Sequence, residues 1–129
     1  MSPPVLDASA LLTLLRNEPG AERVRAAIDG AVMSVVNLAE VVSHYAKLGA
    51  ERAAIEAMLH PLPVKWEPVD AELSYLAGMM RPITLPRGLS LGDRFCLALA
   101  ARHGVAALTA DRRWLDIAGA AGVEVELIR

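Results

Sequence analysis

The chain of 129 residues has little of several residue types, and each scarcity excludes a class of protein. A single cysteine, Cys96, rules out an internal disulfide and predicts a cytoplasmic protein. Aromatic residues make up only 4% of the sequence, so Ala, Leu and Val must supply the core. The longest uncharged stretch in the body of the chain, Gly30 to Ala39, is too short to cross a membrane, because a span takes roughly 20 apolar residues. We therefore expect a cytoplasmic protein without a membrane partner.

Several catalytic motifs are also missing. The three histidines, His44, His60 and His103, are scattered, with no four-residue spacing and no cysteine partners, which argues against a zinc site. No serine lies in a recognisable nucleophile elbow, and no glycine-rich loop ends in Lys-Ser or Lys-Thr. A zinc enzyme, a serine hydrolase and a P-loop protein are all disfavoured.

The charge of the chain is balanced, but its cations are of one kind. A net charge of −2 does not by itself indicate a nucleic-acid-binding protein. Arginine nevertheless outnumbers lysine 11 to 2, and arginine is suited to bidentate phosphate contacts. One group forms either a solvated surface or a rim that grips phosphate: Arg81, Arg87, Arg94, Arg112 and Arg113.

Short apolar runs alternate with helical stripes along the whole chain, which predicts strands separated by helices. The predicted strands are Val5–Leu6, Ala31–Val35, Val64–Pro68, Ala106–Thr109 and Val123–Ile128. The predicted helices are Ala8–Arg16, Ala21–Ile28, Asn37–Leu48, Ala50–Leu59, Asp70–Met80, Ser90–His103 and Arg113–Ala121, with a loop over Arg81–Gly88. Prolines around the third strand predict a place at a sheet edge. The order predicts one α/β domain over residues 1–129, a three-layer α/β/α sandwich around a parallel sheet of four to five strands.

Four acidic residues lie where a short apolar run meets the start of a helix: Asp7, Glu40, Asp93 and Asp111. Strand ends and helix starts converge on one edge of such a sheet, where ligands bind. Four carboxylates gathered there would repel one another and raise one another's pKa unless a cation neutralised them. Mg²⁺ and Mn²⁺ prefer oxygen ligands, so the pattern indicates metal-dependent phosphoryl chemistry.

The first two acids also have structural explanations. Asp7 is suited to cap the helix that follows it. Glu40 shares a helix face with Asn37 and has apolar neighbours. Because an unpaired buried carboxylate is costly, Glu40 is expected to have a metal or, less favourably, an arginine as its partner.

The later acids have rival explanations as well. Ser90 and Asp93 match a capping box, although Gly92 between them has no helix-forming merit and is better explained by a close approach of another group. Asp111 is also compatible with a simple turn. Asp116 is a fifth candidate one turn further on, where a surface role is favoured. Ser90 and Asp116 are kept as supporting candidates.

Four blocks of the sequence, in this order, resemble the PIN-domain family and, within it, the VapC-type ribonuclease toxins of type II toxin–antitoxin modules. The blocks are Val5–Ala10, Ser34–Val41, Leu89–Arg94 and Leu108–Trp114, and the end of the chain is similar to the last strand of that family. The resemblance implies a PIN-like fold and endoribonuclease activity. It also implies Mg²⁺ or Mn²⁺ held by the four acids, with Asn37 and Thr109 in support.

The resemblance further implies an RNA substrate, a cognate antitoxin and a homodimer. A mean hydropathy of +0.37 independently predicts apolar surface that is buried against a partner. With metal-activated water as the nucleophile, the products carry a 5′-phosphate and a 3′-hydroxyl. Arg87, Arg112 and Arg113 are the expected contacts to the RNA backbone. Few aromatic residues are present to stack on bases, so recognition is expected to depend on RNA shape.

Two alternatives remain open at this stage. One is a non-catalytic PIN-like module that binds RNA or protein and whose acids are structural. The other is a phosphatase with Asp7 as a covalent nucleophile, although Ser9 occupies the position of its usual second acid. The sequence leaves open which RNA is cleaved, which metal is used, whether one or two ions bind, and which antitoxin is the partner.

Overall fold

A five-stranded parallel sheet forms the centre of the protein in the computed structural model, which describes residues 2–129. The strands are β1 (Val5–Leu6), β2 (Val32–Ser34), β3 (Lys65–Glu67), β4 (Ala107–Thr109) and β5 (Val125–Leu127). They lie in the order β3-β2-β1-β4-β5, and every pairing is parallel. This confirms the predicted parallel sheet of four to five strands and places β3 at an edge, as its prolines indicated.

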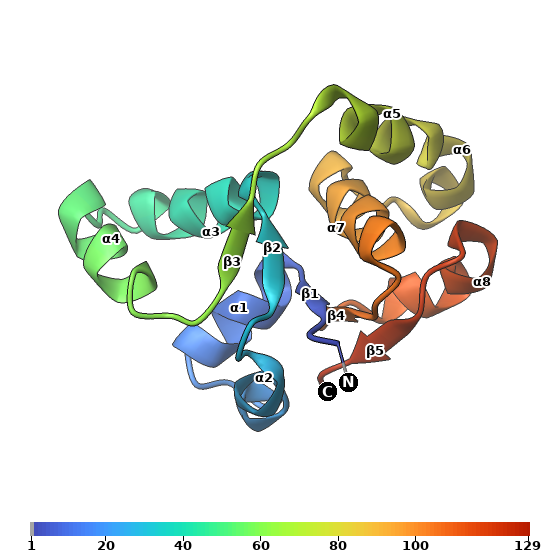
Figure 1. The fold of residues 1–129 in the computed structure, drawn as a ribbon. Coiled ribbons are helices and arrows are strands. Elements are labelled where there is room, and N and C mark those ends of the chain that lie inside the picture. Colours follow the sequence, from blue (N-terminus) through green and yellow to red (C-terminus); the bar gives the residue numbers. More distant parts are fainter. Residues whose placement is uncertain (1) are drawn as a thin grey trace.

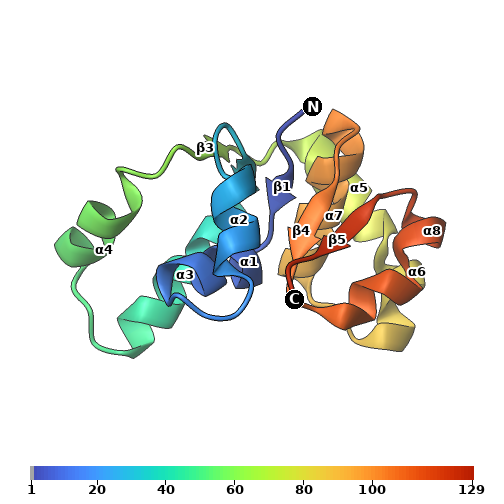
Figure 2. The ribbon, with the colours of Figure 1, turned by 90° about the horizontal axis from the view of Figure 1, so that it is seen from below.

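Helices cover both faces of this sheet, which makes the predicted three layers (Figures 1 and 2). The first group lies on one side and consists of α1 (Ala8–Leu15), α2 (Ala21–Ala27), α3 (Val35–Lys47) and α4 (Arg52–Leu59). The second group lies on the other side and consists of α5 (Ala71–Met79), α6 (Arg81–Thr84), α7 (Leu91–His103) and α8 (Ala118–Ala121). Two 3₁₀ turns, η1 (Leu85–Arg87) and η2 (Arg112–Asp116), complete the second group.

Alternate strand residues supply the two hydrophobic cores. Leu6 and Leu108 point to the side of α1 and pack in one cluster with Leu11, whereas Val5 and Ala107 point to α7 and pack in the other. Successive strand side chains point to opposite faces, so a strand of two or three residues serves both layers. The central strands are buried on both faces, which is why they read as continuous apolar runs.

The predicted loop over residues 81–88 is wrong, because this segment forms α6 and η1. Pro82 and Pro86 suggested a break, but each lies in the first turn of its helix. The backbone N–H that proline lacks has no partner in a first turn, so proline is tolerated there.

Two helix boundaries also differ from expectation. The predicted helix 113–121 is divided into η2 and α8, because the Asp111 side chain accepts the backbone N–H of Arg113 and tightens the first turn. Helix α3 begins at Val35 rather than at Asn37, since Ser34 is its N-cap and accepts the N–H of Val36 at 3.1 Å. Val35 and Val36 are β-branched and continue the apolar run of β2, so the sequence pattern placed the start of the helix too late.

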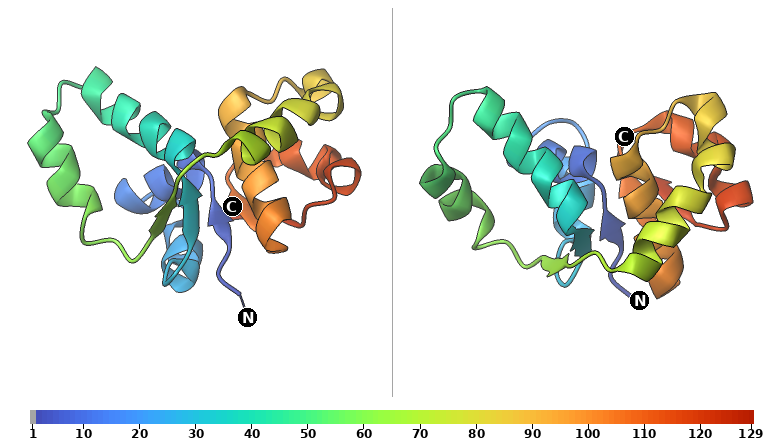
Figure 3. Two further views of the ribbon diagram at one scale, coloured as in Figure 1. Left: turned by 45° about the horizontal axis from the view of Figure 1, so that its top comes forward. Right: turned by 90° about the horizontal axis from the view of Figure 1, so that it is seen from above.

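Helices α3 and α4 form a hairpin that projects from the body of the protein before the chain returns to β3 (Figure 3). Gly49, with a φ of +90°, follows the end of α3 and donates its N–H to the Ala46 carbonyl, as predicted for a helix C-terminus. Within residues 2–129, none of the helices has the length and apolar character that a bilayer span requires.

Candidate metal-binding active site

The four predicted acids lie around the carboxyl ends of the central strands, where the charge of Asp93 acts on Asp7 and Glu40 and that of Asp111 acts on Asp93. Asp7 directly follows β1, and Asp111 follows the adjacent strand β4 by two residues. Glu40 lies in α3, and Asp93 lies in the first turn of α7, which packs against α3. Strands β2 and β3 lie on one side of β1, and β4 and β5 lie on the other. The order of the strands therefore reverses at β1, and ligands of parallel α/β proteins bind at such a switch point.

Asp7 is held rigidly at the bottom of the site. It caps α1 by accepting the N–H of Ala10 at 2.8 Å, which confirms its expected capping role. Ser9 Oγ donates to both of its oxygens, and Thr109 Oγ1 donates to Oδ2 at 2.6 Å. Burial raises the pKa of Asp7 to about 6, although these hydrogen bonds act in the opposite direction. The negative charge of Asp93 makes a smaller contribution to this raised pKa.

Ser9 and Thr109 join Asp7 to the chain that carries Asp111. Ser9 Oγ accepts the N–H of Ala110 at 3.0 Å, and Thr109 Oγ1 accepts the N–H of Asp111 at the same distance. The positioning role of Ser9 was not predicted from the sequence, in which Ser9 only spoke against a phosphatase. Its spacing two residues after Asp7, where a hydroxyl can turn back onto a capping carboxylate, was the available signal.

Glu40 lies across the start of α7 and not inside the core. The residue is exposed, which corrects the expectation that burial forces it to find a metal or an arginine. Asn37 Nδ2 donates to Glu40 Oε1 at 2.7 Å and to the Gly92 carbonyl at 3.0 Å, so Asn37 ties α3 to α7. Partial desolvation between the two helices raises the pKa of Glu40.

Gly92 is explained by this contact. A β-carbon added to Gly92 would lie 2.6 Å from Glu40 Cδ, which is closer than real β-carbons approach another atom. The expected close approach at Gly92 is therefore present, and the approaching group is the Glu40 carboxylate. Because Gly92 is buried inside a helix, this contact is its most direct justification.

Asp93 combines the two roles that the sequence set against each other. Its Oδ2 accepts the N–H of Ser90 at 2.8 Å while Ser90 Oγ accepts the N–H of Asp93 at 3.2 Å, so the capping box is real. The other oxygen, Oδ1, accepts no hydrogen bond among the described residues. Desolvation raises the pKa of Asp93, and the charge of Asp111 acts in the same direction.

Asp111 differs from the other three because it already has a cationic partner. Arg113 Nε lies 3.0 Å from Oδ1, and Arg113 Nη2 lies 2.5 Å from Oδ2. These charge-assisted hydrogen bonds lower the pKa of Asp111, in contrast to the raised values of the other acids. The sequence assigned Arg113 to RNA and did not identify this pair.

The remaining candidates lie around this cluster. Asp116 pairs with Arg87 (Oδ2 to Nε, 3.2 Å) and is exposed, in agreement with the favoured surface role. Arg112 turns to the end of the chain and donates to the Arg129 carbonyl at 3.2 Å. Of the three proposed RNA contacts, Arg113 is therefore the one that lies against the acids.

The four carboxylates suit a hard divalent cation in their donor chemistry. Among residues 2–129, however, no three acidic, histidine or cysteine side chains stand close enough to hold one ion in the present side-chain arrangement. Within the same residues, the buried Asn37 Oδ1 also lacks a hydrogen-bond partner, which leaves an oxygen beside Glu40 unsatisfied. Coordination of one ion by three of these side chains would require a different arrangement of the side chains.

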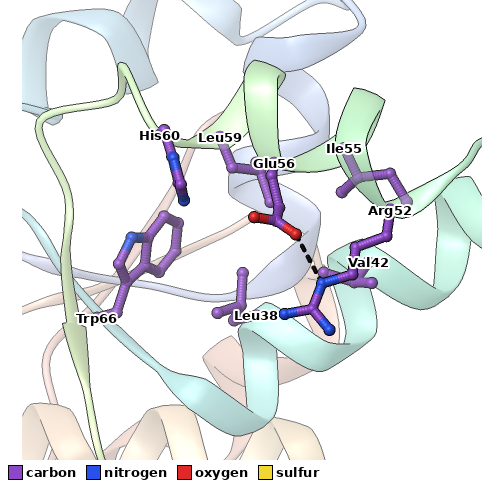
Figure 4. A pocket seen from close by; sticks show the side chains of 8 residues that line it. All are labelled: Leu38, Val42, Arg52, Ile55, Glu56, Leu59, His60 and Trp66. Carbon is purple, nitrogen blue, oxygen red and sulfur yellow. Dashed lines mark hydrogen bonds and ion pairs between the residues drawn. The ribbon is translucent and has the colours of Figure 1, made fainter.

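A cavity lies away from these acids, between α3, α4 and β3 (Figure 4). Its volume is about 420 Å³, and five apolar side chains line it: Leu38, Val42, Ile55, Leu59 and Trp66. An ion pair between Arg52 Nε and Glu56 Oε1, 2.6 Å apart, and the side chain of His60 complete the wall. The chemistry of the acids and this apolar hollow are separate features of the surface.

Residues 5–120 match the PIN domain, so the chain belongs to the PIN domain family. No curated protein is significantly similar to it in sequence. The family assignment and the fold agree with the sequence blocks from which the resemblance was drawn.

Solved structures share the fold over nearly the whole chain. A DNA-bound VapBC from Salmonella typhimurium is similar with a TM-score of 0.74 and 21% identity, and the match covers 100% of both chains. A toxin–antitoxin complex from Klebsiella pneumoniae gives a TM-score of 0.73 at 20% identity and 98% coverage of both chains. VapC20 of Mycobacterium tuberculosis, a toxin that cleaves the sarcin–ricin loop, gives 0.72 at 22% identity over 92% of this chain and 95% of its own. The fold is that of VapC structures.

Proposed function

We propose that this protein is a metal-dependent endoribonuclease and the toxin of a toxin–antitoxin module. The observation that carries the proposal is the convergence of four acids from separate segments at the switch point of the sheet. Burial raises the pKa of Asp7, Glu40 and Asp93, and the negative charge of a neighbouring acid adds to each shift, as is common at functional sites. Membership of the PIN family and the likeness to VapC20 support the same reaction class.

The residues of the site have distinct tasks in this proposal. Asp7, held by Ser9 and Thr109, is the anchor, whereas Glu40 and Asp93 supply further carboxylate oxygens and Asp111 is the fourth acid. A bound Mg²⁺ or Mn²⁺ supplies Lewis acidity, which activates water and neutralises charge that develops on the phosphate. Water as the attacking group yields a 5′-phosphate and a 3′-hydroxyl.

RNA is the proposed substrate, and exposed arginines are its proposed contacts. Arg87 and Arg113 lie on the side of the site formed by η1 and η2, and Arg112 lies beyond them. Guanidinium groups suit phosphate oxygens without reading sequence. Aromatic residues are scarce, so recognition of RNA shape is favoured over base stacking.

The antitoxin is the proposed occupant of the apolar cavity between α3 and α4. The supporting observations are that a matching structure is a toxin–antitoxin complex and that apolar side chains line much of this cavity. Val42→Glu places a charge in the hollow and is expected to weaken binding of the adjacent gene product without lowering RNA cleavage. Ser43→Glu, on the next and exposed position of α3, is the control.

Cleavage of RNA by the purified chain, with mapping of the product ends, tests the function. We expect cleavage with Mg²⁺ or Mn²⁺, loss of cleavage with EDTA, and loss in Asp7→Asn and Asp93→Asn. RNA binding without cleavage would favour the non-catalytic module, which the capping roles of Asp7 and Asp93 also suit. A phosphorylated Asp7 recovered from a reaction with a phosphate monoester would instead identify a phosphatase.

A further inference from the structure

Among residues 2–129, Arg113 is the cationic side chain that forms an ion pair with one of the four acids. Its guanidinium engages both oxygens of Asp111, with Nε at 3.0 and 3.1 Å and Nη2 at 2.5 Å. The Asp111 carboxylate also accepts the backbone N–H of Arg113 at 3.0 Å. The same carboxylate is therefore the cap of η2 and one half of a bidentate ion pair.

The other end of the guanidinium reaches the chain before α7. Arg113 Nη1 donates to the carbonyl of Arg87 at 3.1 Å and lies 3.4 Å from that of Gly88. Gly88 has a φ of +67°, and a β-carbon there would lie 3.5 Å from Nη1, so the turn fits closely around the arginine. Arg113 thus connects the segment of Asp111 to the segment that leads into Ser90 and Asp93.

We propose that Arg113 is a positioning residue that acts as a resident counter-ion, holding Asp111 in an ion pair with which a divalent cation must compete. In the metal-free protein, the Asp111 carboxylate is then already paired with Arg113. Binding of the cation depends mainly on the carboxylates of Asp7, Glu40 and Asp93. A cation that binds through Asp111 competes with the Arg113 guanidinium, because each carboxylate oxygen already accepts a hydrogen bond from it. The inference rests on the proposed metal-dependent function and assigns Arg113 a role that differs from a simple RNA contact.

Binding of Mn²⁺ to the purified full chain, measured by the electron paramagnetic resonance of free Mn²⁺ at low ionic strength, tests this without reference to activity. Arg113→Gln is expected to raise the affinity for Mn²⁺ roughly two- to fivefold, the range of a partly exposed ion pair. Arg112→Gln removes the same charge from the neighbouring position, where the guanidinium donates to the backbone oxygen of Arg129, and is expected to change affinity less. Adding Asp111→Asn to Arg113→Gln is expected to abolish the gain.

Two further comparisons keep the test decisive. Asp111→Asn alone is expected to weaken Mn²⁺ binding far less than Asp93→Asn, and this holds even if Arg113→Gln does not fold. Equal effects of Arg113→Gln and Arg112→Gln, or a gain that survives Asp111→Asn, would overturn the inference and leave the nuclease proposal intact. A wild-type chain that binds no Mn²⁺ would overturn both.

Discussion

At the scale of single residues, Asp7 shows how a structural and a catalytic demand can share one side chain. Its carboxylate caps α1 and is also the most buried acid of the cluster, with an exposed fraction of 4%. Burial favours the protonated form, while Ser9, Thr109 and the Ala10 N–H favour the charged form. The balance leaves the pKa at about 6. Near neutral pH the buried carboxylate is charged in the metal-free protein, and this charge lowers the free energy of unfolding.

The stability of the metal-free protein is expected to fall as pH rises from about 4 through about 6. The folded state of Asp7 holds its proton more tightly than the unfolded state, so its stabilising effect is complete at low pH and is lost above its folded pKa. At about 1.36 kcal/mol per pKa unit, a shift from 3.8 to about 6 corresponds to about 3 kcal/mol. Urea unfolding of wild type and Asp7→Asn in EDTA should show a difference that changes over this range. A difference that is constant with pH would contradict the prediction.

Gly92→Ala is expected to damage the site while sparing the fold. The added methyl group displaces the Glu40 carboxylate, whereas alanine favours a helix by up to about 1 kcal/mol relative to glycine. We therefore expect cleavage and Mn²⁺ affinity to fall at least tenfold with no loss of thermal stability, since roughly 1.4 kcal/mol of lost binding is sufficient. Gly119→Ala in α8, where a β-carbon meets nothing within 4 Å, is the control. Full activity in Gly92→Ala would show that the position of Glu40 is unimportant.

At the scale of elements, the first turn of α7 contains both the capping box of the helix and one acid of the candidate metal site. Ser90 and Asp93 satisfy each other's backbone N–H groups, and one Asp93 oxygen remains available to a ligand. This explains why a capping pattern in the sequence did not exclude a functional reading. The helix ends as predicted at Gly104, whose φ of +64° is left-handed.

The two roles of this turn are separable. Ser90→Ala removes the N-cap oxygen and is expected to destabilise the protein by about 1 kcal/mol with activity retained in the folded fraction. Asp93→Asn keeps an oxygen that can accept the Ser90 N–H but removes the charge, so cleavage should be lost with stability unchanged or raised. Thermal melts and RNA cleavage of both variants give the answer. Unfolding of Asp93→Asn, together with metal-independent wild type, would restore a purely structural role.

At the scale of the whole molecule, a cation should act as a folding ligand. Only the folded chain gathers acids from four segments, so saturation at about 100 times the dissociation constant adds roughly 2.7 kcal/mol. The gain should disappear at acid pH, because protonated carboxylates do not bind metal. Melting temperatures with Mg²⁺, Mn²⁺ and EDTA at two pH values measure it. A melting temperature that neither Mg²⁺ nor Mn²⁺ changes at neutral pH would contradict the proposed metal site.

The molecule is also expected to self-associate through α5. Tyr75 and Met79 are 72% and 74% exposed on this helix, beside Leu76, and solvent would otherwise meet this apolar face. A second copy of the chain is the proposed occupant, so light scattering should give the mass of a dimer. Tyr75→Glu should shift the mass toward the monomer, whereas Ser43→Glu on α3 should not. A monomeric wild type would contradict this while leaving the nuclease proposal intact.

The sequence by itself determined the five strands, the parallel sheet and the longer helices, and it placed four acids at strand ends and helix starts, because periodicity, caps and strand ends are local patterns. It also marked Gly92 as a position that needs a close neighbour. Only the tertiary structure identifies this neighbour as Glu40, because Glu40 lies 52 residues earlier in the chain, on another helix. In the same way, only the fold shows that Glu40 is exposed and that Ser9 hydroxyl joins Asp7 to Ala110.

The direction of the Arg113 side chain could not be predicted from the sequence. Its position two residues after Asp111 suggested a charged rim, and a local pattern cannot say whether the side chain points to solvent or back to its neighbour. The direction depends on the carbonyls of residues 87 and 88, which the packing of η1 beside η2 brings to the guanidinium. Distances between side chains from separate segments are set by packing, and packing is a property of the whole fold.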